Sequence, residues 1–432
     1  MIVDPTSVCE LLVGLGDVTV LGADDEPGGP IRVHVETRGA RPACPACGGP
    51  VWAKDQRRVE LVDLAAFGRP ARLVWHKRRW SCPAQPCSTS SFTEVAPWIA
   101  ATRLVMTDRA GRWVTEQVGR RGRTVNEVAI ELGCDWHTVN DTVIAYGTPL
   151  IDDPDRIGDT TALGLDETLF VKLGPWRTQN WSTSIVDVGK GQLLDVIPGR
   201  SSTGACGWLA GQTQAWLDQI EWATLDLSGP WRLAFTTMVP DAVQIADPFH
   251  LVKLANSRLD EVRRRVQHET FGHRGHKSDP LYRSRRLLTK ASERLDDRGR
   301  TRLLGLLDAG DPRGEVRLAW HAKEVVRSIY DHTDPDLALA TVTELGRDLQ
   351  DETRPPEIRQ LGRTITKWRH QIAAWHQAHV SNGPTEAANN LIKRVKRVAF
   401  GFTSFRNYRI RTLLYAGKPN WSRLATLTPP SP

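Results

Sequence analysis

Three acidic side chains, far apart in the sequence, have the surroundings that metal-assisted chemistry on a phosphate requires. Asp166 lies within the apolar stretch TTALGLDETLFVK, and Asp226 comes near the end of another, EWATLDL. Glu386 opens the stretch TEAANNLIKRVKRVAF, which turns strongly basic within two helical turns. Acids beside several cations suit a divalent ion held next to a phosphate backbone. For Glu386 the alternative is a solvated helix face with charge pairs four residues apart.

Four of the seven cysteines form two short knuckles, CPAC and CPAQPC, near the N-terminus. Two strand-like segments, 59–64 and 71–80, run between the knuckles and would bring them together as a hairpin. Four thiolates so arranged predict one structural zinc ion, which would contribute much of the folding energy of so small a domain. Free buried cysteines or a redox pair are the alternative. The expected zinc ligands are Cys44, Cys47, Cys82 and Cys87.

The stretch from 160 to 247 must position Asp166 and Asp226. Its pattern predicts three antiparallel strands, a helix, a strand, a helix and a strand, which is the order of the ribonuclease-H-like fold. In that fold the fourth strand lies beside the first, so the two carboxylates would meet at one sheet edge. Strand alternation sends Glu167 to the opposite face. The expected strands are 160–172, 181–188, 192–198, 221–227 and 242–246, and the expected helices are 203–220 and 229–239.

Asp247 is a competitor of Asp226, because it also ends a strand close by. That strand lies one place further from the first, and Pro248, Phe249 and His250 follow it, which favours a role in packing and orientation. Magnesium prefers oxygen ligands, so His250 is expected to support the site rather than to bind the metal. The geometry therefore favours Asp226 as the ligand and gives Asp247 and His250 a supporting role.

Glu386 needs a helix to present it. Gly383 and Pro384 predict a helix start, with Glu386 in the first turn. An apolar stripe is expected to pack, and a second stripe carries the acid followed by polar and basic side chains. The expected packed stripe is Ala387, Leu391, Val395 and Val398, and the polar stripe is Glu386, Asn390, Lys393 and Arg397.

Residues 96–155 read as helical and contain a helix, a turn with Gly133 and a second helix capped by Asp135. This is the layout of a DNA-reading helix-turn-helix, and the alternative is a plain helical hairpin. The small core would comprise Val125, Val128, Ala129, Leu132, Val139 and Val143, and the groove-facing side chains would be His137, Thr138, Asn140 and Asp141.

The composition indicates that the protein binds a polyanion. The 432 residues carry a net charge of +7 and give a pI of about 9.1, and arginine, which makes bidentate phosphate contacts, outnumbers lysine. We expect a soluble protein of the bacterial cytoplasm, associated with the nucleoid and not with a membrane. Residues 253–377 are polar, basic and helical, and would be a scaffold or a DNA-contacting arm, with most of the charges on a solvated helical surface. Their arginines cluster at Arg258, Arg263, Arg264, Arg265, Arg283, Arg285 and Arg286.

Taken together, these pieces resemble the DDE transposases of the ISL-three insertion-sequence family over nearly the whole chain. The resemblance rests on RRVELVDL and KRRWSCPAQPCSTSSFTE around the knuckles, and on GLDET, TLDLS, ADPFHLVKLAN and NGPTEAANNLIKRVKRVAFGF further on. It implies DNA strand cleavage and transfer by an acidic triad with Mg²⁺ or Mn²⁺. By position the triad is Asp166, Asp226 and Glu386. The family tends to follow its second Asp with a methionine, a serine and a nearby aromatic, whereas Leu227 follows here.

The expectation is thus a transposase that binds terminal inverted repeats in double-stranded DNA, cleaves the ends and joins the 3′-hydroxyls to target DNA, as a homodimer or higher oligomer. The alternatives are a DNA-binding regulator with an inactive catalytic domain, or a nuclease that does not join strands. DNA contacts are expected from His137, Thr138, Asn140, Asn390, Lys393, Lys396 and Arg397. The expected domains are 1–95 (zinc), 96–155 (helix-turn-helix), 156–252 (catalytic core), 253–377 (helical insertion), 378–418 (core helix with Glu386) and 419–432 (tail).

Overall fold

The computed structural model describes residues 5–429, and internal contacts divide the chain into two compact units. The N-terminal unit comprises Met1–Gly158 with Asn390–Pro432, and the central unit comprises Asp159–Asn389. Residues 430–432 of the expected tail lie outside the described residues. Among the helices described, none is both long enough and apolar enough to cross a membrane.

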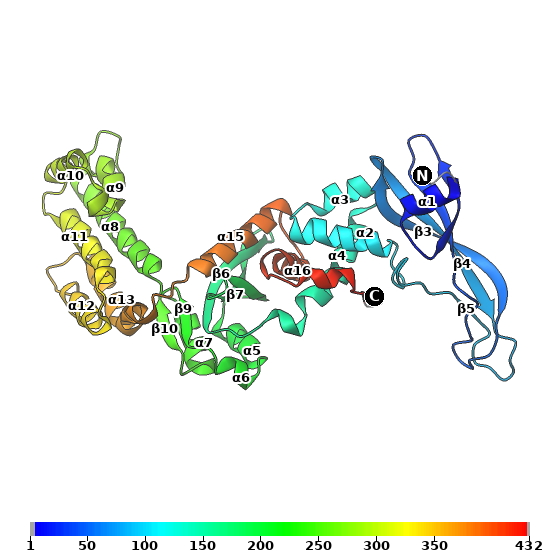
Figure 1. The fold of residues 1–432 in the computed structure, drawn as a ribbon. Coiled ribbons are helices and arrows are strands. Elements are labelled where there is room, and N and C mark those ends of the chain that lie inside the picture. Colours follow the sequence, from blue (N-terminus) through cyan, green and yellow to red (C-terminus); the bar gives the residue numbers. More distant parts are fainter. Residues whose placement is uncertain (1–4, 430–432) are drawn as a thin grey trace. The chain divides into compact units, whose positions relative to one another are not determined.

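A five-stranded sheet forms the first part of the N-terminal unit, in the order β1-β2-β4-β3 with β5 paired to β4. The hairpin β3–β4 is longer than expected and reaches β5 at its far end (Figure 1). The core under this sheet includes Val18, Val35, Leu73 and Trp75. The elements are α1 (Pro5–Val13), β1 (Val18–Asp25), β2 (Ile31–Thr37), β3 (Trp52–Ala66), β4 (Arg69–Ser81) and β5 (Ser91–Thr93).

A helical group completes the N-terminal unit. The expected helix pair is confirmed: α3 starts at a capping box between Thr124 and Glu127 and ends at Gly133, whose φ is 60°, and Asp135 caps α4. All six expected core residues of this pair are buried. The elements are α2 (Asp108–Thr115), the π-helical turn η1 (Glu116–Arg120), α3 (Val125–Leu132), α4 (Trp136–Ile151), η2 (Pro154–Arg156), α16 (Phe405–Ala416) and η5 (Trp421–Ala425).

The helix α16 packs on α4 within this unit, which the sequence analysis did not foresee. A Cβ on Gly147 of α4 would lie 2.9 Å from the Leu414 side chain, so glycine permits the close approach. Residues 390–418 therefore group with the N-terminal unit by their contacts, whereas we had expected 378–418 to belong to the catalytic core. The apolar face of α16 is buried here, with Ile410, Leu413 and Leu414 all in the core.

The central unit contains a second five-stranded sheet, in the order β10-β9-β6-β7-β8. The strands β6, β7 and β8 are antiparallel neighbours, and β9 and β10 run parallel to β6. The expected order of strands and helices is confirmed, although the helix expected over 203–220 is broken after Gly211 into two. The elements are β6 (Ala162–Leu173), β7 (Thr178–Asp187), β8 (Gln192–Pro198), α5 (Ser202–Ala210), α6 (Gln214–Leu217), β9 (Trp222–Leu225), α7 (Gly229–Met238) and β10 (Val243–Ala246).

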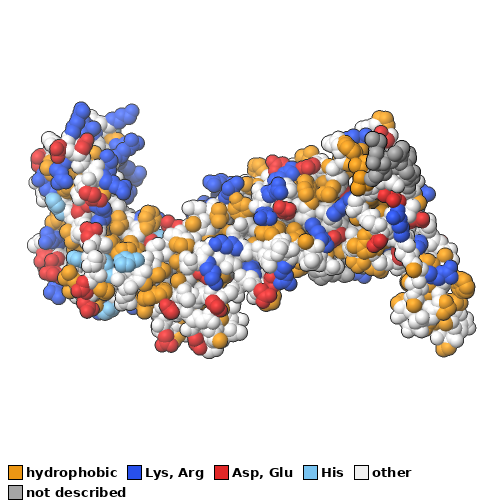
Figure 2. Space-filling view, viewed as in Figure 1, with side chains coloured by type: hydrophobic (Ala, Val, Ile, Leu, Met, Phe, Trp, Pro, Cys, Tyr) orange, Lys and Arg blue, Asp and Glu red, His pale blue; other side chains and the backbone are white. Residues whose placement is uncertain are grey.

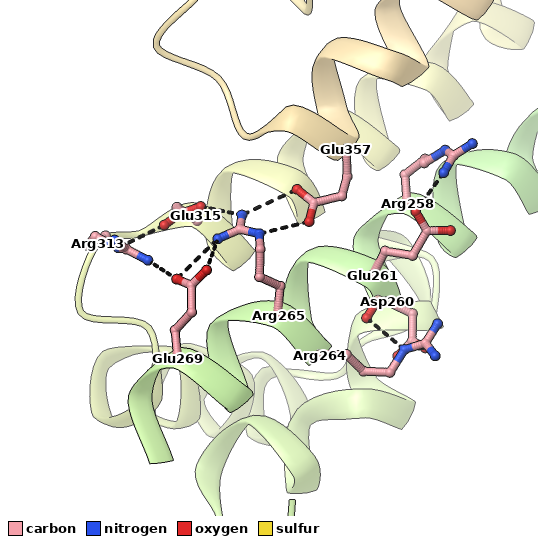
Figure 3. Close-up of polar contacts among 9 residues, drawn as sticks. All are labelled: Arg258, Asp260, Glu261, Arg264, Arg265, Glu269, Arg313, Glu315 and Glu357. Carbon is pink, nitrogen blue, oxygen red and sulfur yellow. Dashed lines mark hydrogen bonds and ion pairs between the residues drawn. The ribbon is translucent and has the colours of Figure 1, made fainter. Parts of the chain in front are cut away.

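Between β10 and α15 the chain forms a group of packed helices, seen together in Figure 1. Arginines of α8 that looked available for DNA are paired inside this group (Figure 3). Arg265 binds Glu357 at 2.8 Å, Glu315 at 2.5 Å and Glu269 at 3.2 Å, which joins three helices. The elements are α8 (Pro248–Phe271), α9 (Pro280–Thr289), η3 (Ser292–Arg294), α10 (Asp297–Gly310), α11 (Glu315–Ser328), η4 (Ile329–Asp331), α12 (Pro335–Asp348), α13 (Pro356–Ala373) and α14 (Trp375–Ala378).

Other basic side chains of this helical group remain on its surface. Figure 2 shows Lys and Arg gathered over α9 and α10 on the face in view. Arg258, Arg263 and Arg264, by contrast, pair with acids three or four residues away on α8 itself. Of these α8 arginines, Arg265 joins separate helices, whereas the other three pair within α8.

The helix α15 (Gly383–Val398) starts where its sequence predicts. Its packed stripe was predicted in part: Val395 is buried as expected and Val398 is half-buried, but Ala387 and Leu391 are exposed, and Ala388 and Ile392 are buried in their place. The reason is that buried polar side chains share this face, so apolarity alone does not locate it. The buried face comprises Thr385, Ala388, Asn389, Ile392 and Val395.

Candidate functional site

Three neighbouring strands bring three aspartates to the same level of the central sheet, Asp166 within β6 and Asp226 and Asp247 just after the ends of β9 and β10. Leu165 on β6 pairs with Leu225 on β9, and Leu225 pairs with Ala246 on β10. The residue after each of these in the chain is Asp166, Asp226 or Asp247, so the three lie at the same level. This confirms that β9 lies directly beside β6 and that β10 lies beyond it.

Asp226 has the environment of a metal ligand. Its Oδ1 is buried and has no hydrogen-bond partner among the described residues. Burial, followed by the charge of Asp166, raises the pKa of Asp226 from 3.8 to about 6. A cation bound beside such a carboxylate would stabilise its ionised form and offset the cost of burying the charge. The residues present therefore fit a divalent metal at this position.

Asp247 differs from Asp226 in that the protein already occupies both of its oxygens. It is 4% exposed, its Oδ1 accepts the backbone N–H of Asn382 at 3.0 Å, and its Oδ2 lies 3.1 Å from His250 Nδ1. That hydrogen bond is the main cause of the raised pKa of His250, and the charges of Asp226 and Asp166 add to it. The imidazole Nε2 lies 4.0 Å from Glu386 Oε1. Asp247 and His250 thus connect the sheet edge to the start of α15.

Asn389 is a site residue that the sequence analysis missed. Its Nδ2 donates to Asp166 Oδ2 at 2.6 Å, and its Oδ1 accepts the hydroxyls of Thr168 at 2.9 Å and Ser184 at 2.8 Å. The Asp166 carboxylate, which can only accept, fixes the NH₂ side of the amide toward itself, and the two hydroxyls can then donate to the amide oxygen. The signal was present as helical spacing: Asn389 lies three residues after Glu386, whereas we followed the stripe four residues on, to Asn390.

The first turns of α15 lie very close to the sheet. Asn382, just before the helix, accepts the hydroxyl of Thr224 on β9 at 3.0 Å. On β6, Gly164 faces Thr385, and a Cβ there would lie 2.3 Å from the Thr385 hydroxyl oxygen. Glycine at this position is therefore required for the helix to approach. Glu386 is held between the anchors at Asn382 and Asn389, and its side chain is partly exposed.

The carboxylates of Asp166, Asp226 and Glu386 do not form a group as tight as a single-ion site. Among the described residues, the four cysteines are the only set of three or more ligand side chains whose ligating atoms all lie within 4.8 Å of one another. Two cations about 4 Å apart need ligands spread over a longer span. A two-ion site would not require all three acids to meet this spacing. Glu167 pairs instead with Arg200 at 3.4 Å.

The four cysteines converge as expected. The sulfurs of Cys44 and Cys87 are 3.8 Å apart, and those of Cys47 and Cys82 are 3.6 Å apart. A tetrahedron with zinc–sulfur bonds of about 2.3 Å has edges of about 3.8 Å, so these distances fit zinc. Hydrogen bonds from the backbone of Cys47 and Ala46 lower the pKa of Cys44 to about 7, whereas burial and the neighbouring thiols raise the pKa of Cys82 and Cys87. The apolar support of the site is Val51, Trp80 and Phe92.

The side chains expected to contact DNA are only partly exposed. His137 is exposed and Thr138 is half-buried on α4, but Asn140 is buried, so the expectation that it faces a groove on the helix surface is wrong. Asn140 lies on the covered side of α4, next to the buried Val139. The polar stripe of α15 is exposed at Asn390, Lys393 and Arg397, whereas Lys396 is half-buried and burial lowers its pKa.

Comparison with known proteins places both parts of the chain. A family model described as a transposase matches residues 163–412. A model described as the zinc finger of the transposases of IS204, IS1001, IS1096 and IS1165 matches residues 40–87. The N-terminal region is therefore a zinc ribbon, and the four cysteines are its ligand set.

Individual relatives agree with the family models. The chain is similar to the transposase for insertion sequence element IS1557 of Mycobacterium tuberculosis, with 27% identity over 62% of this chain and 63% of that protein, a little under two thirds of its length. It is also similar to the transposase for IS1001 of Bordetella parapertussis, with 23% identity over 88% of this chain and 89% of that protein. The chain belongs to the ISL-three family of DDE transposases.

Proposed function

We propose that this transposase binds the terminal inverted repeats of its insertion sequence, cleaves the element ends and transfers the 3′-hydroxyl ends to target DNA. The observation that carries the proposal is the arrangement of Asp166 and Asp226 on adjacent strands, with Glu386 held over the same sheet edge by the anchors of α15. The strand order and directions support a ribonuclease-H-like catalytic unit.

The proposed roles of the residues follow from their contacts. Asp166, Asp226 and Glu386 would hold Mg²⁺ or Mn²⁺, which when bound activates the attacking water and stabilises the leaving oxygen. Asn389 keeps one oxygen of Asp166 fixed through its amide. Asp247 orients His250 toward Glu386. A residue that fixes a ligand within a fraction of an ångström affects rate more than binding.

DNA recognition is proposed for the N-terminal unit and the exposed polar stripe of α15. The helix pair α3–α4 supports a helix-turn-helix reading, with His137 and Thr138 toward the bases. Asn390, Lys393 and Arg397 would contact phosphates, which position the protein without reading sequence. We further propose that the protein acts on double-stranded DNA as a homodimer or higher oligomer, because two element ends must be processed together.

A strand-joining assay tests this function. The full chain would be incubated with Mg²⁺, a labelled duplex carrying the terminal inverted repeat, and a target plasmid. The proposal predicts cleavage at the repeat end and transfer of the label to the plasmid. Cleavage without transfer would instead support a nuclease, and binding without cleavage would support a DNA-binding regulator.

A further inference from the structure

A pocket of about 310 Å³ lies within the N-terminal unit, between the start of α3 and the segment that joins α15 to α16. Polar and aromatic side chains from four elements line it, and the catalytic carboxylates contribute nothing to it. Asn140, which the sequence placed on an outer surface, lines this pocket instead. The residues that the argument uses are Glu127, Trp136, Asn140, Phe400 and Arg411.

Arg411 is a buried cation that lacks a counterion. Its residue is 6% exposed, its Nε has no hydrogen-bond partner, and no ion pair joins it to an acid among the described residues. The neighbour that faces its charge is the Phe402 ring, 5.3 Å from Cζ. Burial alone lowers the pKa of Arg411 to about 10. A charge buried at such a cost, with no acidic partner among the described residues, points to an anionic partner from outside.

The pocket's acid does not supply the missing partner. The Glu127 side chain accepts the backbone N–H of Thr124 at 3.0 Å, as part of the cap that starts α3. It makes no ion pair with Arg411 in the described structure, and it does not contribute to the pKa shift of the guanidinium. An anionic ligand is therefore the group that would satisfy Arg411.

Phe400 stands at the rim of the same pocket in an unfavourable backbone conformation. Its φ is 54°, and it ends α15 in a turn where Phe400 N–H bonds Arg397 C=O and Gly401 N–H bonds Lys396 C=O. Helices usually place glycine at this position, because a Cβ is strained there. The ring is 94% exposed, so packing within the chain does not offset the strain. What distinguishes this ring from other exposed ones is its place at the pocket beside Arg411, where it is available to a ligand.

We infer that this pocket binds one unstacked nucleotide of the transposon-end DNA, with its phosphate on Arg411 and its base stacked on Phe400. A cation and an exposed aromatic ring are the two groups that single nucleotides require, and both are present here together. Trp136, also exposed, offers a second stacking surface, and the Asn140 amide offers hydrogen bonds to a base edge. This inference rests on the proposed binding of element ends.

The test places 2-aminopurine, which fluoresces more strongly when unstacked, at successive positions of a duplex carrying the terminal inverted repeat. We expect the full chain to raise the fluorescence at one position. Phe400→Gly and Arg411→Met should each abolish that rise and weaken duplex binding about 10-fold or more. Both variants should melt at the wild-type temperature or a few degrees above it, because they remove strain or an unpaired buried charge.

Phe67→Gly is the matched control. Phe67 is also exposed, at 86%, with a φ of 52°, but its neighbour Arg69 is paired with Asp25 at 2.7 Å. This variant should keep the fluorescence rise. Two outcomes would overturn the inference and leave the proposed function intact. In the first, the wild-type chain binds and cleaves the duplex without any such rise in fluorescence. In the second, the rise persists in both pocket variants. Failure of the wild-type chain to bind the repeat would overturn the proposed function and the inference with it.

Discussion

At the scale of single residues, Asp226 and Asp247 follow neighbouring strands at the same level, yet their hydrogen-bond partners indicate different roles. Both oxygens of Asp247 accept hydrogen bonds from the protein or lie against His250. Asp226 keeps one buried oxygen without a partner. The first arrangement stabilises the fold, whereas the second leaves a negative charge that a cation can neutralise.

This difference predicts how pH affects stability without divalent cations. The pKa of Asp226 rises from 3.8 to about 6 on folding. The folded state then binds more protons, so this carboxyl destabilises the fold increasingly as pH rises from about 4 to about 6. Asp226→Asn does not titrate, so its stability relative to wild type should increase by about 1–2 kcal/mol between pH 5 and pH 7.5.

The measurement is thermal unfolding of both proteins at the two pH values in magnesium-free buffer that leaves zinc in place. Asp247→Ala serves as the contrast and should destabilise the protein at pH 7.5, because it removes two acceptors. A stability difference between Asp226→Asn and wild type that does not change with pH would contradict this assignment.

Residue types alone could locate the acids but not the amide that orients them. Asp166, Asp226 and Glu386 stand out because charged residues interrupt apolar or basic stretches. Asn389 does not stand out, since Asn at a helix position is common, and only the approach of α15 to β6 and β7 gives it three partners. Asn140 was misjudged for the related reason that polarity does not determine which side of a helix is covered.

At the scale of elements, the contact between α15 and β6 determines where Glu386 lies. Gly164→Ala would place a methyl group 2.3 Å from the Thr385 hydroxyl oxygen and 2.8 Å from Val188. The first turn of α15 must then move away, so DNA cleavage should fall about 100-fold or more while duplex binding stays near wild type. Gly207→Ala on α5, where no heavy atom lies within 4 Å of the added Cβ, should cleave normally. Equal activity of the two variants would argue against the contact.

The helical insertion depends on one arginine that joins three helices. Arg265→Met leaves Glu357 without its arginine, removes one of the two arginines that pair with Glu315, and should destabilise the protein by about 2 kcal/mol. Arg264→Met, which removes an exposed pair with Asp260 on the same helix, should change stability by less than about 0.5 kcal/mol. Urea unfolding of both variants checks this, and equal stability would mean that the network in Figure 3 is not important for the fold.

Element order was predictable, but helix phase was not, and one helix break was missed. The strand expected over 192–198 has those bounds in the structure, because a glycine turn and an apolar run delimit it. The helix expected over 203–220 breaks at Gly211, and the buried face of α15 is shifted by one position over part of its length. The break follows local signals, Gly211 at the end of α5 and the Thr213 cap of α6. The buried face of α15 depends instead on its contacts with the sheet, which periodicity alone does not give.

At the scale of the whole molecule, removal of zinc should affect the N-terminal unit and leave the unit that carries the acids folded. The zinc ligands belong to the N-terminal unit, and the acids belong to the central unit. Purified protein should contain one equivalent of zinc. Its removal by a chelator should increase hydrogen exchange over residues 40–93 and leave β6 to β8 protected, because each unit has its own core. Less than half an equivalent of zinc, with residues 40–93 still protected after chelation, would contradict the zinc assignment.

The central claim is that Asp166, Asp226 and Glu386 carry the chemistry and that Asp247 supports them. The most direct test is single-turnover cleavage of the inverted-repeat duplex by Asp226→Asn and Asp247→Asn, each with Mg²⁺ and with Mn²⁺. Asp226→Asn should lose cleavage and retain duplex binding, whereas Asp247→Asn should retain measurable cleavage. Normal cleavage by Asp226→Asn together with an inactive Asp247→Asn would contradict the claim and reassign the triad to Asp166, Asp247 and Glu386.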